Sequence, residues 1–505
     1  MRWQFRGLLR LSLVALLAAS LAAVTVCRAA PLEAAQATSG REVEAVVRYL
    51  EAGGRVPGWA ASPSVSAALA QEAQRNGLAG VAASAASERL PPAGKSLWAA
   101  LRLARMLARG AIAPTSVEPS WTIPVPEFNR DATLRILVLL DDPLPWLRGL
   151  APEDDGYRRL QQALAAYDAI ARQGGWPVIA AGPRLALGMS GDRVATLRAR
   201  LAIEGDLAPG TPAGSVFDAE TQDAVRRFQM RHGFSADGRV GPDTLAAMNV
   251  DARQRYRQIA AALERWRWLP HRLPRERVMV NAAAARLTLV ADGSPVLELR
   301  TIVGTPRRPT PVLMATITSL LFNPPWNIPA AIAAHEIRPH ARRDPAYLRR
   351  ERIVAVEGGR LRQLPGDKNA LGRLKFEMPN PLDIYLHDTP TKDLFNRARR
   401  FFSHGCVRVE HPEALALQLL RHDPAWTNEA IAGAMAAGTT RREPIDPTVP
   451  VFVIYVTAAV EAEGAVAFFG DIYHRDPPLI DALFRATPAP SRGVAQAAGG
   501  WPHRP

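Results

Sequence analysis

The stretch RVMVNAAAARLTLVADGSPVLELRTIVG, residues 277–304, determines the fold of the C-terminal half of this chain. Two largely apolar, alternating runs flank Asp292 and Gly293, an arrangement typical of a β-hairpin because both positions of the tight turn need positive φ. Further strand patterns follow in ATITSLLFN, LDIYLHD and VPVFVIYVT, residues 315–323, 382–388 and 449–457. Residues 275–475 are therefore predicted to form a mainly β domain with some helix.

One segment interrupts the strand pattern. Residues Ala330 to Gly359 are helical in pattern, rich in charge and too long for a simple connection, so we expect a helical insert near the site. Residues 251–274 are predicted to form a helical connector before the β domain. Residues 476–505 are predicted to form a C-terminal helix and a tail whose Pro, Ala and Gly bias indicates disorder.

The N-terminal half has the three- and four-residue spacing of apolar residues that amphipathic helices show. Residues 31–183 repeat this spacing between Pro-rich connections and are predicted to form a helical scaffold without a catalytic constellation. Residues 184–250 predict a compact three-helix unit, in which Asp192, Asp218 and Asp243 are candidate N-caps. The predicted fold class is multidomain α+β.

Residues 1–30 have the pattern of a secretory signal peptide. Three arginines without an acidic residue precede an apolar run of 16 residues, Leu11 to Val26. This run is slightly short for a membrane span of about 20 residues, so a cleaved signal is favoured over an uncleaved anchor. We therefore expect a periplasmic protein that contacts the membrane only through this segment.

The net charge is +14, and four arginines within residues 1–30 account for four of these charges, which leaves +10. Such a balance often indicates nucleic-acid binding. An exported protein, however, meets anionic cell-wall polymer and membrane surface instead, and the arginines are scattered rather than clustered with aromatic residues. No nucleic-acid partner is expected.

Cysteine usage directs attention to FFSHGCVRVEHP, residues 401–412. The chain has two cysteines, and Cys27 lies inside the signal, so Cys406 has no partner once the signal is removed. An unpaired thiol in an oxidising compartment is either buried as a small apolar group or used for its reactivity. The residues around it must distinguish these cases.

A nucleophilic thiol needs a base, because a free cysteine is mostly protonated at neutral pH. His387 ends the strand pattern LDIYLH 19 residues before Cys406, so two strands and a loop could bring the two together. Gly405 allows the backbone amides around the thiol to face a developing oxyanion. Arg408 falls on the same strand face as Cys406 and could bind a substrate carboxylate. Singly, each residue could be structural; together they favour catalysis.

The motif SHGCVRV with an upstream YLHD resembles the signature of the YkuD-type L,D-transpeptidase catalytic domain. The segments GDRVATLRARL, FDAETQDAVRRFQMRHGF and DGRVGPDTLAAMN resemble the peptidoglycan-binding domain family. The further segments LERWRWLP, LFNPPWNIP and NALGRLKFEMPNPLDIYLHDTP are similar to the YcbB-like branch, with a scaffold, an internal peptidoglycan-binding domain and a capping subdomain. Arg408 departs from the asparagine common elsewhere in the family, although arginine is usual in this branch.

The resemblance implies that Cys406 forms a thioester with the third residue of a stem peptide, releases the terminal D-alanine and makes a 3-3 cross-link. It also implies that a backbone carbonyl orients the base His387, that carbapenems acylate the thiol, and that no cofactor or metal takes part. Glycan strands and other cell-wall synthesis proteins are possible partners. The remaining site candidates are backbone groups for the oxyanion and side chains for substrate binding: His404, Gly405 and Cys406 for the former, and Arg408, Tyr385 and Ser403 for the latter.

Other functions remain open at this point. The same site could act as an L,D-carboxypeptidase or exchange D-amino acids, and the chain could be a wall-binding scaffold without activity. A sortase-like or papain-like enzyme fits the order and spacing of His and Cys poorly. A zinc hydrolase would need its ligands from one of two sets of residues, and the spacing of neither set matches a strong pattern. The sets are His387, His404, Cys406 and His411, or His335 and His340.

Overall fold

The computed structural model describes residues 40–79, 85–208, 210–461 and 464–484. The predicted signal peptide with Cys27, and the tail from residue 485, lie outside these ranges. Within them, no helix combines the length and apolar character that crossing a membrane requires.

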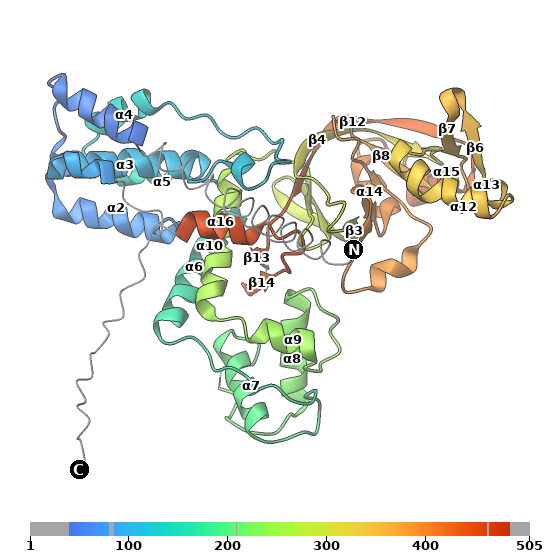
Figure 1. The fold of residues 1–505 in the computed structure, drawn as a ribbon, viewed down its shortest axis with the longest axis horizontal. Helices are drawn as coiled ribbons and strands as arrows, with labels where there is room; N and C mark the ends of the chain where they lie inside the picture. Colours follow the sequence, from blue (N-terminus) through green and yellow to red (C-terminus); the bar gives the residue numbers. More distant parts are fainter. Residues whose placement is uncertain (1–39, 80–84, 209, 462–463, 485–505) are drawn as a thin grey trace, which may run out of the picture.

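The N-terminal region is helical and is built around one almost completely buried helix, α3 (Pro92–Arg109). Leu97, Leu101 and Leu107 of α3 are inaccessible to solvent, so this helix forms the centre of the region's core. Figure 1 shows its neighbours stacked on either side. The surrounding helices are residues 40–51, α2 (Pro63–Arg75), α4 (Arg130–Leu139), α5 (Leu144–Arg148) and α6 (Asp155–Arg172), with short 3-10 turns at η1 (Gly58–Ala61), η2 (Ala85–Arg89) and η3 (Pro114–Ser116).

Two helices join this region to the C-terminal half. The connector helix α10 (Ala252–Arg267) packs against α6, and α16 (Asp476–Phe484) returns from the end of the β domain to α10 (Figure 1). Leu479 and Leu483 of α16 belong to the same buried cluster as the leucines of α3. The two ends of the described chain therefore share one core.

A separate three-helix unit has a core of its own. It consists of α7 (Asp192–Ile203), α8 (Ala219–Arg231) and α9 (Pro242–Met248). Asp218 caps α8 as predicted, because its side chain accepts a hydrogen bond from Thr221 N–H. The same prediction is wrong for Asp192 and Asp243, which lie in the first turns of α7 and α9 and follow glycine caps. There the carboxylates still face the positive ends of the helices.

The β domain contains a sheet of nine strands in the order β10-β3-β11-β9-β8-β4-β12-β1-β2. Because β2 also pairs with β3, eight of these strands close into a ring, and β10 is attached outside it. The predicted hairpin is confirmed, with φ of +52° at Asp292 and +85° at Gly293. The strands are β1 (Arg277–Asn281), β2 (Arg286–Ala291), β3 (Ser294–Gly304), β4 (Leu313–Phe322), β8 (Leu374–Glu377), β9 (Leu386–His387), β10 (Phe401–Ser403), β11 (Val407–Val409) and β12 (Arg441–Ile454).

Three smaller parts complete the β domain. Helices α14 (Pro412–Leu419) and α15 (Asn428–Ala436) follow β11, and η6 (Lys392–Asn396) precedes β10. The antiparallel pair β13 (Ala458–Val460) and β14 (Val466–Phe468) lies next to α10 and the three-helix unit.

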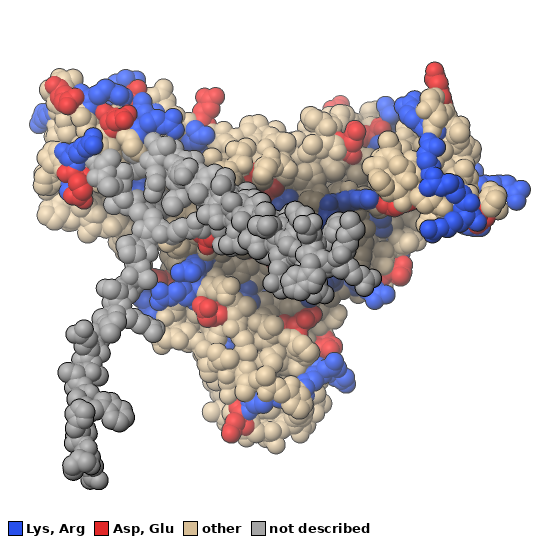
Figure 2. All heavy atoms as spheres, viewed as in Figure 1, with Lys and Arg blue, Asp and Glu red and all other residues tan. Residues whose placement is uncertain are grey.

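The segment between β4 and β8 is an insert with its own small apolar cluster. After β5 it is helical as far as Arg350, and its second half adds two strands, one of which pairs with β5 and with the other strand in a separate three-stranded sheet of order β5-β7-β6. Its elements are β5 (Trp326–Asn327), α11 (Ala330–Ile332), the π-helix η4 (Ala333–Ile337), α12 (Arg338–Arg343), α13 (Tyr347–Arg350), β6 (Ile353–Val356), η5 (Glu357–Gly359) and β7 (Arg360–Gln363). Figure 2 shows basic side chains gathered along this part of the molecule, where Arg342, Arg343, Arg349 and Arg350 are exposed.

Candidate active site

The pairing of two short strands brings the predicted catalytic residues together. Strands β9 and β11 are parallel, with Leu386 opposite Val407 and His387 opposite Arg408. Since alternate residues of a strand share a face, Cys406 and Arg408 lie on the same face as His387. From strand geometry, the α-carbons of Cys406 and His387 are about 8 Å apart, within reach of side chains that point toward each other.

The loop that precedes the thiol is held by its own side chains. The Ser403 hydroxyl accepts a hydrogen bond from Gly405 N–H at 3.1 Å and donates one to the Cys406 carbonyl at 2.5 Å. Gly405 has φ of +126°, which a residue with a side chain rarely adopts. Ser403 therefore shapes the loop, whereas its predicted substrate contact stays a prediction. Of the backbone amides predicted to donate to the oxyanion, that of Gly405 already donates to the Ser403 hydroxyl.

His387 is buried and oriented by the backbone. Its Nδ1–H donates to the Asp388 carbonyl oxygen at 2.5 Å, so Nε2 of the neutral ring is the free acceptor. The Asp388 carboxylate does not take part, because it binds Lys392 and accepts from Arg373 N–H. Burial, followed by the nearby Arg408 charge, lowers the pKa of His387 to about 3. The ring is therefore neutral at physiological pH.

The Cys406 thiol is half-buried and donates to the Asp383 carbonyl at 3.7 Å. Asp383 has φ of +50°, a strained value for a residue with a side chain. Burial raises the pKa of Cys406, and a hydrogen bond from the Tyr385 hydroxyl acts in the opposite direction. Together with the low pKa of His387, this means that the resting pair is a thiol and a neutral imidazole. These surroundings do not favour a resting thiolate beside an imidazolium.

Three further side chains, those of Tyr385, Lys375 and Arg408, lie on this face around the thiol. Tyr385 packs its ring edge-on against His387, with ring centroids 5.6 Å apart, and Lys375 Nζ lies 4.3 Å from the Tyr385 ring. Arg408 reaches Thr391 Oγ1 at 3.4 Å, and no carboxylate of the described residues forms an ion pair with it. Arg408 thus carries a positive charge beside the nucleophile that an incoming carboxylate could neutralise.

The insert contacts the catalytic loop directly. Glu336, in the π-helix η4, accepts hydrogen bonds from His404 Nε2 at 2.7 Å and from Arg308 at 2.9 Å. Burial raises the pKa of the Glu336 carboxyl, but the bonds from these two residues outweigh it and hold the pKa below the usual value. The sequence marked His404 for its backbone and as one ligand of the alternative zinc site, and it gave no signal for this contact with Glu336. Within the described part of the chain, no group of three or more His, Cys, Asp or Glu side chains is arranged to hold a metal ion.

Three segments of the chain match known families. Residues 275–437 match the L,D-transpeptidase catalytic domain, residues 190–248 match a family described as "Putative peptidoglycan binding domain", and residues 98–164 match the Scaffold domain. The chain therefore combines a scaffold, a peptidoglycan-binding domain and an L,D-transpeptidase catalytic domain, the YcbB-like architecture. These domains imply a location outside the cytoplasm, at the cell wall.

Individual relatives are similar to parts of this chain. A Haemophilus influenzae protein described as "Putative L,D-transpeptidase" is 37% identical over 219 residues, which cover 39% of this chain and 44% of that protein. The match thus spans less than half of the relative. A solved L,D-transpeptidase from Stackebrandtia nassauensis is 16% identical, covering 54% of this chain and 94% of that one, with a TM-score of 0.24. A solved L,D-transpeptidase from Xylanimonas cellulosilytica is 17% identical, covering 55% of this chain and 99% of that one, with a TM-score of 0.18. Similarity this low supports no conclusion about function.

Proposed function

We propose that this protein is a periplasmic peptidoglycan L,D-transpeptidase in which Cys406 is the nucleophile and His387 the base. The observation that carries the proposal is the pairing of β9 with β11, which puts a half-buried thiol, a neutral imidazole and an unpaired guanidinium on one face. This combination suits acyl transfer from a substrate that ends in a carboxylate.

The first half-reaction forms a thioester. The Cys406 sulfur attacks the carbonyl carbon of the third residue of a tetrapeptide stem while the thiol proton moves to His387 Nε2. Because the resting pair is neutral, this proton transfer accompanies the attack rather than preceding it. The bond to the terminal D-alanine then breaks, and its amine leaves with the proton from His387.

The second half-reaction forms the cross-link. The side-chain amine of the diamino acid in a second stem attacks the thioester carbonyl and gives a proton to His387. The carbon–sulfur bond breaks and the sulfur regains a proton, which restores the thiol. The product joins two third residues in a 3-3 cross-link, whereas water in place of the amine would release a tripeptide and make the enzyme an L,D-carboxypeptidase.

Substrate contacts are proposed for three side chains around the thiol. Arg408 would bind the terminal carboxylate of the donor stem, because none of the described residues gives it an acidic partner. Tyr385, which hydrogen-bonds to the Cys406 sulfur, would line the same pocket. The Ser403 contact is less direct, since both of its hydrogen bonds lie within the loop.

Binding of the wall polymer is proposed for the three-helix unit. A groove of about 430 Å³ runs along it to the residues before β10, where Arg399 forms an ion pair with Asp243 at 3.1 Å. Phe234 and Arg239 also line this groove, and an aromatic face beside charged groups suits a glycan that carries carboxylates. The exposed arginines of the insert add positive charge on the catalytic side.

Mass analysis of muropeptides after incubation with purified protein tests the proposal. Wild-type protein should convert tetrapeptide stems into 3-3 dimers with release of D-alanine, and Cys406→Ala should produce neither. His422→Ala, in an exposed turn between α14 and α15, serves as the matched control for His387→Ala. Tripeptides without dimers would favour the carboxypeptidase, and unchanged muropeptides would favour a scaffold without activity.

A further inference from the structure

The hydrogen-bond ladder between β3 and β11 stops one step before the nucleophile. These strands are antiparallel, with Arg408 opposite Ile302, and Glu410 N–H donates to the Arg300 carbonyl at 3.1 Å. In such a ladder every second pair exchanges two hydrogen bonds. The next pair would therefore be Cys406 and Gly304.

Side chains take the place of this missing pair. Gly304 N–H donates to Thr310 Oγ1 at 2.8 Å, and the Gly304 carbonyl accepts from the Tyr473 hydroxyl at 2.8 Å. The Cys406 carbonyl accepts from Ser403, as described above. Three of the four backbone groups are thus occupied, and Cys406 N–H is the one group that has no acceptor among the described residues.

Thr310 also determines the direction of the free N–H group. Its hydroxyl donates to the Gly405 carbonyl oxygen at 2.8 Å, and the residue is completely buried. In a trans peptide the C=O and the following N–H point in opposite directions. With the Gly405 carbonyl held toward Thr310, the Cys406 N–H points away from the protein interior.

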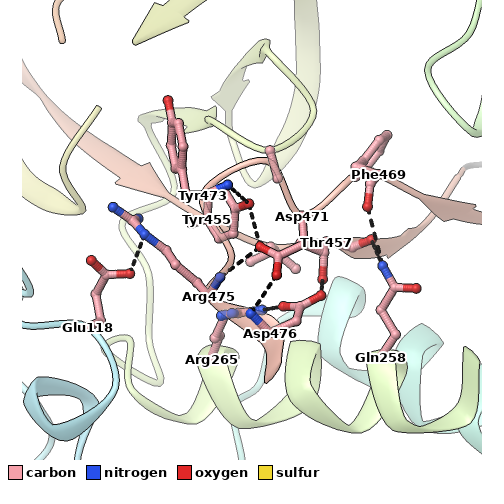
Figure 3. Close-up of polar contacts among 12 residues, drawn as sticks. Glu118, Gln258, Arg265, Tyr455, Thr457, Phe469, Asp471, Tyr473, Arg475 and Asp476 are labelled. Atoms are coloured by element: carbon pink, nitrogen blue, oxygen red, sulfur yellow. Dashed lines mark hydrogen bonds and ion pairs between the residues drawn. The ribbon is translucent and has the colours of Figure 1, made fainter. Parts of the chain in front are cut away.

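Tyr473 connects this arrangement to the rest of the molecule. Its hydroxyl accepts from Thr310 N–H at 3.2 Å, and its own N–H donates to the Tyr455 hydroxyl at 3.1 Å. Figure 3 shows that the Tyr455 hydroxyl in turn donates to Asp471, whose carboxylate binds the backbone of the turn that follows Tyr473. This turn is fixed to α10 by the ion pair between Asp476 and Arg265.

We propose that Thr310 and Tyr473 are positioning residues that keep the Cys406 N–H free of the β-ladder and aim it at the oxyanion of the acyl-transfer step. Thr310 fixes the direction of the Gly405–Cys406 peptide, and Tyr473 occupies the Gly304 carbonyl that would otherwise accept from Cys406 N–H. This role rests on the proposed function, because it requires a carbonyl substrate at Cys406.

Two reactions of the Cys406 thiol distinguish a misdirected Cys406 N–H from a general change in the structure around the thiol. Acylation by a carbapenem develops negative charge on an oxygen, whereas alkylation by iodoacetamide displaces iodide without forming an oxyanion. Complete loss of an oxyanion donor costs about 10²- to 10³-fold in rate. We expect Thr310→Val to slow acylation about 10- to 100-fold, because the donor is misdirected rather than removed, and to change alkylation less than about 3-fold.

Two further variants complete the test. Thr310→Ser keeps the hydroxyl and should acylate within about 3-fold of wild type, while Tyr473→Phe frees the Gly304 carbonyl and should slow acylation without affecting alkylation. Equal slowing of both reactions in Thr310→Val, or unchanged acylation in both Thr310→Val and Tyr473→Phe, would overturn the proposal. If the wild-type thiol is alkylated but never acylated, the proposed function itself fails, and that outcome is distinct from the other two.

Discussion

Glu118→Gln should destabilise the protein through the contact between the N-terminal helical region and the turn that carries Tyr473. Glu118 pairs with Arg475 at 2.7 Å, and the two side chains are only 8% and 10% exposed. Arg475 lies beside the stacked rings of Tyr455 and Tyr473, and each ring centroid is 4.9 Å from its guanidinium carbon (Figure 3). Its charge therefore has little access to water when its partner becomes neutral.

The size of the effect follows from this burial. Removing one member of a buried ion pair typically costs about 3 to 5 kcal/mol of stability. Because the amide of Gln keeps part of the hydrogen bonding, we expect the free energy of unfolding to fall by about 3 kcal/mol. The matched control is Glu153→Gln, because Glu153 and Arg272 form a pair of similar length, 3.0 Å, whose side chains are 57% and 85% exposed. Exposed pairs contribute about 0 to 1 kcal/mol.

Urea unfolding followed by tryptophan fluorescence measures both variants against wild type. We expect a clear shift of the unfolding midpoint for Glu118→Gln and almost none for Glu153→Gln. We also expect slower acylation of Cys406 in Glu118→Gln, because the turn that holds Tyr473 is loosened. Equal midpoints for the two variants would refute the reasoning about this interface.

Three further predictions concern the site and the wall polymer. Because the pKa of His387 is about 3 in the folded protein, the rate of Cys406 acylation should not fall between pH 7 and 5. A base with an ordinary imidazole pKa would lose activity in this range, so a rate that halves near pH 6.5 would contradict the prediction. Glu336→Gln should speed amide hydrogen exchange across residues 330–359, since it weakens the bonds that Glu336 accepts from His404 and Arg308; unchanged exchange would show that these bonds do not hold the insert in place. Phe234→Ala should reduce pelleting of the protein with purified sacculi several-fold, while the control Val216→Ala, exposed on the same unit, should not. Equal pelleting of the two variants would show that the groove does not bind the wall polymer.

The parts of the fold that depend on neighbouring residues could be predicted from the sequence. The Asp292-Gly293 turn needs only local backbone freedom, and the Asp218 cap needs only the helix that follows it. The caps assigned to Asp192 and Asp243 were wrong because a glycine before each of them can also begin a helix, and sequence spacing does not distinguish a cap from the first turn.

The residues that surround the thiol could be predicted only in part. Cys406, His387 and Arg408 were recognisable because their motif is local and their chemistry is distinctive. Thr310 and Tyr473 carry ordinary side chains, and their bonds join residues 95 and 169 positions apart, so no local pattern indicates them. The low pKa of His387 likewise depends on burial and on a charge that only the strand pairing brings near.

Intact-mass measurement after incubation with a carbapenem, followed by peptide mapping, tests the central claim most directly. We expect one drug molecule added per chain, located on Cys406, no adduct on Cys406→Ala, and slow acylation of a folded His387→Ala protein. An adduct on another residue, or D-alanine release from stem peptides by Cys406→Ala at the wild-type rate, would contradict it.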